Sequence, residues 1–189
     1  MLAPPRGRLP PARETLHQHL MSFASGRAND DLLAKMLASH ALGEGVLPAD
    51  FGVGKHRFGQ LIERHFPGLQ WRTASAAAPL PLPERDDLVK LLSQDAAGDP
   101  DEGYDVAHIV AAACQGSDHL WQDLGLWSRA ELTRLMRTNF PALAARNNGD
   151  MKWKKFLYKQ LCLQEGIYVC RAPSCETCVD YPVCFGSEE

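Results

Sequence analysis

The sequence predicts an irregular all-α domain that ends in a cysteine-rich loop with the ligands for a metal cluster. Apolar residues recur at helical spacing along most of the 189-residue chain. No segment shows the alternating pattern of a β-strand, and the apolar run at 167–169 is too short to build a sheet. All but one of the six cysteines lie in the final stretch of the chain, from residue 162 onward. Together these observations predict helices followed by a metal-binding tail.

Composition divides the chain into an arm, one domain and two unusual segments. Residues 1–12 are rich in proline and predict a flexible N-terminal arm. Residues 13–189 predict a single helical domain, because this length can bury a sizeable core. Within the domain, residues 72–84 are rich in alanine and proline and predict a linker segment. Residues 162–189 form the cysteine-rich tail that we expect to bind the cluster.

Helical periodicity and end signals place the helices along the domain. Asn29 or Asp30 is the expected N-cap of the second helix, and Ser128 with Glu131 forms a capping box for a later one. Asp150 is the expected cap of the last helix. The helices are expected at residues 13–24, 29–43, 53–68, 84–97, 106–113, 128–140, 141–147 and 150–166.

Charge and composition exclude several classes of protein. Twenty Lys and Arg against twenty-three Asp and Glu give a formal net charge of −3, which argues against a dedicated nucleic-acid binder. No apolar run is long enough to cross a membrane, and none follows the basic N-terminus as in a secretory signal, so we expect a cytoplasmic protein. The GVGK at 52–55 is too short for a P-loop, and no hydrolase motif is present, so we expect no enzyme.

Four cysteines of the tail have the spacing of a compact metal site, C-x4-C-x2-C-x5-C: Cys170, Cys175, Cys178 and Cys184. In a reducing compartment, clustered cysteines indicate metal binding rather than disulfides. Thiolates are soft ligands that suit an iron–sulfur cluster, Zn²⁺ or Cu(I). A structural zinc site usually pairs two separate C-x2-C knuckles, whereas this chain has one C-x2-C within a single loop, which favours the iron–sulfur cluster.

The tail and the segments before it closely resemble the NifQ family of nitrogen-fixation proteins. The resemblance depends on HLWQDLGLWSRAELTRLM at 119–136, on MKWKKFLYKQLC at 151–162, and above all on the four-cysteine motif closing with CFG. It implies a molybdenum donor, or metallochaperone, that supplies molybdenum for the biosynthesis of the nitrogenase iron–molybdenum cofactor. It also implies that Cys170, Cys175, Cys178 and Cys184 bind a molybdenum–iron–sulfur cluster or its 4Fe–4S precursor.

The same resemblance implies the partners of the chain. These are the nitrogenase cofactor-assembly scaffold, the nitrogenase iron protein, and molybdate or another molybdenum source. Molybdate is a hard oxyanion that suits thiolates poorly, whereas molybdenum held among sulfides is soft and suits them well. A carrier of this kind would therefore keep molybdenum in the chemical form that the cofactor needs.

Other residues are weaker candidates for the metal site. Cys162 is a candidate fifth thiolate, and His119 is a candidate ligand for molybdenum entry, with Cys114 and His108 behind it. The alternative interpretation places all of them in the core or at helix ends.

Basic and aromatic residues near the tail also have two interpretations. Lys152, Lys154, Lys155 and Arg171 would attract molybdate or an acidic partner, or simply form the solvated face of a helix. The indole rings of Trp121, Trp127 and Trp153 are expected in the core.

Two alternative functions remain open at this point. The segment LPADFGVGKHRFG at 47–59 faintly resembles the hairpin of helix–hairpin–helix DNA-repair glycosylases, which also end in a four-cysteine loop that binds 4Fe–4S. Their motif, C-x6-C-x2-C-x5-C, differs from this chain only in the first gap. A helical interaction protein with a zinc-stabilised tail is the other alternative.

Overall fold

The computed structural model describes residues 12–71, 83–164, 166 and 181–186. The described residues form helices and contain no strand, which confirms the all-α fold class. Residues 1–11 of the expected arm, residues 72–82 of the expected linker, and residues 165, 167–180 and 187–189 lie outside this part. The helices are α1 (Ala12–Met21), α2 (Asp30–Ala41), α3 (Lys55–His65), α4 (Pro83–Gln94), α5 (Pro100–Ala113), α6 (Leu120–Asp123), α7 (Arg129–Asn139), α8 (Pro141–Arg146), α9 (Trp153–Gln164) and α10 (Tyr181–Phe185).

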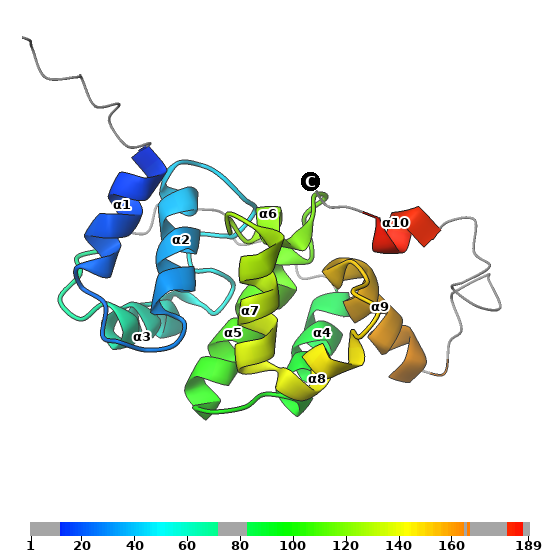
Figure 1. Cartoon of the computed structure of the whole chain (residues 1–189). Coiled ribbons are helices and arrows are strands. Elements are labelled where there is room, and N and C mark those ends of the chain that lie inside the picture. Colours follow the sequence, from blue (N-terminus) through cyan, green and yellow to red (C-terminus); the bar gives the residue numbers. More distant parts are fainter. Residues whose placement is uncertain (1–11, 72–82, 165, 167–180, 187–189) are drawn as a thin grey trace, which may run out of the picture.

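The helices form two groups on either side of a central pair (Figure 1). Helices α1, α2 and α3 lie at one end of the molecule, and α4, α8 and α9 lie at the other. Helices α5 and α7 lie between these groups and contact each other. Helix α5 also packs on α4, which in turn packs on α9. The short α10 lies beyond α9, at the outer edge of the second group. In the described part of the chain, no helix is long and apolar enough to span a membrane.

One cluster of apolar side chains connects these helices. Two of the faces that periodicity predicts are buried as expected. On α3 the buried residues are Phe58, Leu61, Ile62 and His65, and on α9 they are Trp153, Phe156, Leu157 and Leu161. Burying large side chains of this kind contributes about 1.5–3 kcal/mol each, so these faces orient both helices.

Several helix ends differ from the prediction for local reasons. Helix α5 begins at Pro100, because Asp99 caps it by accepting a hydrogen bond from the N–H of Asp101 (3.0 Å). Ser128 caps α7 as predicted, accepting from the N–H of Glu131 (3.3 Å). The predicted cap of α9 is wrong: the helix begins at Trp153. The short helices α6 and α10 were not predicted, because a helix of four or five residues is too short to show helical periodicity.

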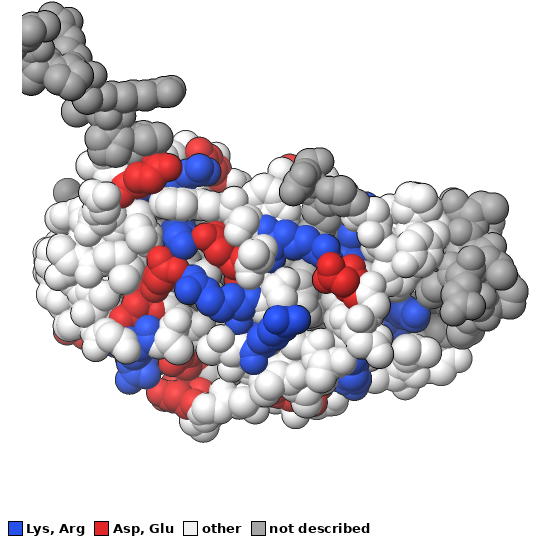
Figure 2. Space-filling view, viewed as in Figure 1, with Lys and Arg blue, Asp and Glu red and all other residues white. Residues whose placement is uncertain are grey.

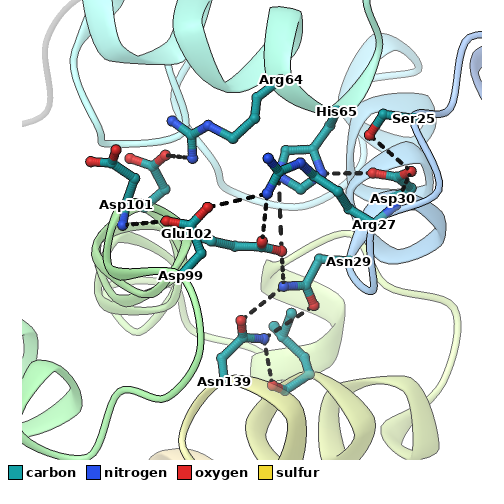
Figure 3. A network of polar contacts seen from close by, with 12 residues as sticks. Ser25, Arg27, Asn29, Asp30, Arg64, His65, Asp99, Asp101, Glu102 and Asn139 are labelled. Carbon is teal, nitrogen blue, oxygen red and sulfur yellow. Dashed lines mark hydrogen bonds and ion pairs between the residues drawn. The ribbon is translucent and has the colours of Figure 1, made fainter.

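A buried carboxylate joins the start of α2 to the end of α3 (Figure 3). The Asp30 side chain is 2% exposed. One of its oxygens accepts hydrogen bonds from the backbone N–H groups of Gly26 (2.7 Å) and Arg27 (2.8 Å). Its other oxygen lies 2.7 Å from Nδ1 of His65, which is also buried. The loop before α2 and the last turn of α3 therefore share the Asp30 carboxylate.

Asn29, the predicted N-cap, makes no capping hydrogen bond with its side chain. Its Nδ2 instead donates to Oδ1 of Asn139 in α7 (2.8 Å) and to Oε1 of Glu102 in α5 (2.5 Å). Asn139 Nδ2 donates back to Asn29 Oδ1 (3.1 Å) and to the carbonyl of Leu135 (2.8 Å). The paired amides, seen in Figure 3, join the first group of helices to the central pair.

A second buried carboxylate joins α3 to α5. Asp105 is 1% exposed and forms ion pairs with Arg57 and with Arg64 of α3 (3.1 Å to Arg64). The guanidinium of Arg57 also lies 4.2 Å from the ring centroid of Tyr104, which adds a cation–π contact. The ion pairs compensate the burial of the Asp105 carboxylate.

We expect Asp30→Ala to destabilise the protein by about 3 kcal/mol, because it leaves the buried His65 and the N–H groups of Gly26 and Arg27 without their acceptor. Urea unfolding followed by circular dichroism measures the change in the free energy of unfolding. Asp87→Ala is the control, because within the described part of the chain Asp87 pairs only with the exposed Lys90, and it should leave the unfolding midpoint unchanged. Equal shifts in the two variants would contradict the role of Asp30.

Candidate metal centre

The structure describes one of the four predicted cluster ligands. Cys184 lies in α10, where its side chain is half-buried and packs against the edge of the apolar core. Cys170, Cys175 and Cys178 lie outside the described residues, as does Arg171. The predicted ligand set therefore stays a prediction. The described contacts hold Cys184 and the residues around it in place.

The segment that connects α8 to α9 holds α10 in place. The N–H of Lys152 donates to the carbonyl of Cys184 (2.8 Å), and its Nζ donates to the carbonyl of Pro182 (3.3 Å). Gly149 lies against the ring of Phe185, so closely that a Cβ at this position would be 3.4 Å from the ring. Both backbone and side-chain contacts thus fix the helix that carries Cys184.

A buried ion pair fixes the start of α9 on the corner between α5 and α6. Lys154 Nζ pairs with the carboxylate of Asp123, which is 1% exposed, and donates to the carbonyl of Gly116 (2.8 Å). Gly116 packs so closely on this carboxylate that a Cβ there would clash with it. The residue before Lys154 makes a further contact: Trp153 Nε1 donates to Thr133 Oγ1 of α7 (3.3 Å). The first turn of α9 is therefore tied to α6, to α7 and to the segment that connects α5 to α6.

Cys114 is the C-cap of α5 and is buried, as the structural interpretation of this residue predicts. Burial raises the pKa of its thiol to about 12, the nearby Lys154 lowers it, and Asp123 raises it again. A thiol of this kind stays protonated at neutral pH and is a poor metal ligand.

The other candidate ligands lie in separate parts of the described structure. Cys162 is half-buried near the end of α9. His119 is at the N-cap of α6, where its N–H donates to Oε1 of Gln122 (3.2 Å). His108 is half-buried and packs on Tyr104 (4.3 Å between ring centroids), and burial followed by the charge of Arg85 lowers its pKa. Among the described residues, no three Cys, His, Asp or Glu side chains form a group that would bind a metal ion.

The predicted basic face of α9 is only partly solvated. Lys155 and Lys159 are exposed, whereas Lys154 is committed to Asp123. The tryptophans also differ from one another: Trp153 is in the core, and Trp121 packs at its edge. Trp127 is half-buried and lies beneath the guanidinium of Arg13 (4.7 Å to the ring centroid).

Sequence reasoning missed a group of arginines on α7. Arg129, Arg134 and Arg137 lie along one side of the helix and line a surface groove. Figure 2 shows Lys and Arg side chains gathering over α7 on this face of the molecule. The spacing of the three arginines within one helix was visible in the sequence, but the groove depends on the loop that folds back beside them.

Comparison with known proteins establishes the family of the chain. The family model of NifQ matches residues 32–186. Protein NifQ of Azotobacter vinelandii is 44% identical over 176 residues, which cover 86% of this chain and 90% of that protein. Protein NifQ of Klebsiella pneumoniae is 36% identical over 148 residues, covering 78% of this chain and 88% of that one. A NifQ homolog of Sinorhizobium fredii is 35% identical over 161 residues. No solved structure gives a significant match. The chain belongs to the NifQ family.

We expect Cys114 of the folded protein to resist alkylation by iodoacetamide at about pH 8, because only about one thiol in ten thousand is ionised when the pKa is about 12. Mass spectrometry of the labelled peptides, with and without guanidinium chloride, measures the modification. Half-buried Cys162 is the internal control and should react faster in the folded protein. Equal labelling of the two residues would disprove the buried, protonated state of Cys114.

Proposed function

We propose that this member of the NifQ family is a molybdenum carrier that acts in nitrogen fixation, receiving molybdenum on a cysteine-bound iron–sulfur cluster and passing it on. The single observation that carries the proposal is the four-cysteine motif. It lies entirely within the residues that the family model matches, 32–186. We propose Cys170, Cys175, Cys178 and Cys184 as the cluster ligands.

The donor set suits this cargo chemically. Four thiolates are the usual ligands of cubic iron–sulfur clusters, and they match molybdenum once sulfide surrounds it. Molybdenum bound in this way needs no change of ligand type before it enters an iron–molybdenum–sulfur cofactor. The cluster is cargo in this proposal, and the protein is a carrier rather than a catalyst.

The described residues supply an anchored end for the proposed cluster loop. Cys184 is held by the backbone N–H of Lys152, and Lys152 immediately precedes the helix that Trp153 and Lys154 tie to the core. This arrangement fixes the last thiolate of the motif relative to the helical body. A fixed final ligand reduces the conformational entropy lost when a cluster binds.

The recipients that we propose are the nitrogenase cofactor-assembly scaffold and the nitrogenase iron protein. Both follow from the family resemblance. Molybdate, or another molybdenum source, would load the cluster before transfer.

The rival assignment to DNA-repair glycosylases has less support. The segment at 47–59, on which that resemblance depended, lies inside the residues that the NifQ family model matches. The net charge of −3 also disfavours a protein dedicated to the phosphate backbone. A zinc-stabilised tail is distinguished by metal analysis.

We expect protein purified without oxygen from molybdate-fed cells to contain iron, acid-labile sulfide and molybdenum. Cys178→Ala should lose most of the molybdenum, because each motif thiolate is a proposed ligand and one missing ligand opens the cluster. Elemental analysis per chain measures the three elements. Cys114→Ala is the matched control, since this buried thiol is no proposed ligand, and it should retain most of the metal.

The other outcomes of the metal analysis would each overturn the proposal. Full molybdenum retention in Cys178→Ala would refute the ligand assignment. Iron and sulfide without molybdenum would leave a plain cluster and favour the DNA-repair alternative, which glycosylase assays on mismatched duplex then test. Zinc as the sole metal would indicate a structural tail.

A further inference from the structure

A groove lined by arginines runs along the solvent side of α7. It encloses about 590 Å³, and its charged and hydroxyl residues are Arg129, Thr133, Arg134, Arg137, Thr138 and Asp150. A second hollow of about 330 Å³ continues from it toward α8 and shares Arg137 and Asp150. Figure 2 shows this basic region on the face that presents α7. The two hollows together form one elongated surface.

The positive charge of this groove is only partly neutralised. Arg129 pairs with both carboxylate oxygens of Asp150 (2.9 and 3.0 Å). Arg134 pairs with Asp31, which it shares with Lys35 (3.1 Å). Arg137 is exposed, and no described residue forms an ion pair or hydrogen bond with it. A guanidinium without an internal partner is available to a carboxylate from outside.

The wall of the groove also supports the helix that carries Cys184. Asp150 belongs to the segment between α8 and α9, and its backbone adopts a left-handed conformation (φ 52°) under the Arg129 clamp. One residue before it, Gly149 contacts Phe185. Two residues after it, the N–H of Lys152 donates to the carbonyl of Cys184. A partner seated in the groove would therefore lie beside the segment that holds α10 and Cys184.

The length of the groove selects the chemistry of its ligand. The two hollows meet at Arg137, and together they extend from Arg129 at the start of α7 to Ala144 and Ala145 of α8. A small tetrahedral oxyanion is bound by one or two adjacent guanidinium groups. A protein surface with several carboxylates matches an elongated groove around Arg137 better.

We propose that the Arg129–Arg134–Arg137 groove docks an acidic protein surface, and that this contact places the partner near α10, the helix that carries Cys184. This inference rests on the proposed carrier function, because a carrier must bring its cargo to a recipient. The arginines steer the acidic partner by long-range attraction, so association is faster at low salt. Arg137 contributes most to affinity, because its charge is not spent within the described structure.

The test uses the full-length protein and a fluorescein-labelled peptide of about ten glutamates as an acidic probe, in roughly 25 mM salt to limit screening. Fluorescence anisotropy measures the Kd. Arg137→Glu should weaken binding at least about tenfold, because it removes the available cation and adds a repelling carboxylate. Lys90→Glu on α4 is the matched control, because it changes the net charge equally at an exposed site away from the groove, and its Kd should stay within about twofold of the parent's.

Three results would overturn the proposal. Equal weakening by the two substitutions would show that the peptide senses only net charge. Displacement of the peptide by micromolar molybdate, but not by sulfate, would assign the groove to a small oxyanion. Tighter binding of a single-stranded oligonucleotide of equal charge would assign it to nucleic acid.

Metal analysis separates failure of this inference from failure of the carrier function. Arg137 makes no contact that folding requires among the described residues, so Arg137→Glu should keep the iron and molybdenum content of the parent. Unchanged metal with unchanged peptide affinity refutes the docking groove alone. Absence of molybdenum from the parent protein refutes the carrier function, whatever the peptide does.

Discussion

The pairing of Asp30 with His65 joins α2 to α3 within the first group of helices, and the paired amides of Asn29 and Asn139 join that group to the central pair. Apolar burial drives the helices together but tolerates sliding, since it is not directional. A buried carboxylate or amide tolerates much less, because a lost hydrogen-bond partner leaves a polar group desolvated and unpaired. Asn29 and Asp30 are adjacent, yet one contacts α5 and α7 and the other contacts α3. The start of α2 is thus the point at which four helices acquire a unique arrangement.

The same principle operates twice more, with arginine and then with lysine as the partner of the carboxylate. Arg57 and Arg64 compensate Asp105 between α3 and α5, and Lys154 compensates Asp123 between α9 and the α5–α6 corner. Three buried carboxylates therefore fix α3, α5 and α9 in turn. The position of Cys184 depends on these contacts, because the segment that holds Cys184 leads directly into α9. Polar contacts therefore lead from the core to Cys184 in a few steps.

Features that follow from periodic spacing or local end signals were predicted from the sequence. Features that depend on partners distant in the sequence were not. The buried faces of α3 and α9 follow from spacing alone, and Ser128 with Glu131 marked the start of α7 correctly. Asp150 was misjudged because a cap is a local rule, whereas this carboxylate pairs with Arg129, twenty-one residues earlier. Asn29 does lie at the N-cap of α2, but its side chain makes no capping bond because it pairs with Asn139, 110 residues away. At the candidate site, the spacing of the cysteines could be recognised in the sequence. The arginine groove could not, because it forms only when residues 147–150 fold beside α7.

The double tie at Trp153 and Lys154 has a consequence for the length of the segment before them. Connecting segments on protein surfaces commonly accept extra residues. Here, Asn147 hydrogen-bonds the N–H and carbonyl of Met151, Arg129 grips Asp150, and consecutive residues at the start of α9 point to different neighbours. One inserted residue would rotate the first turn of α9 by about 100° relative to its neighbours and release both ties at once. The segment 147–152 is therefore a surface connection whose length is fixed by its contacts with the rest of the molecule. It should not accept the insertions that such connections commonly accept.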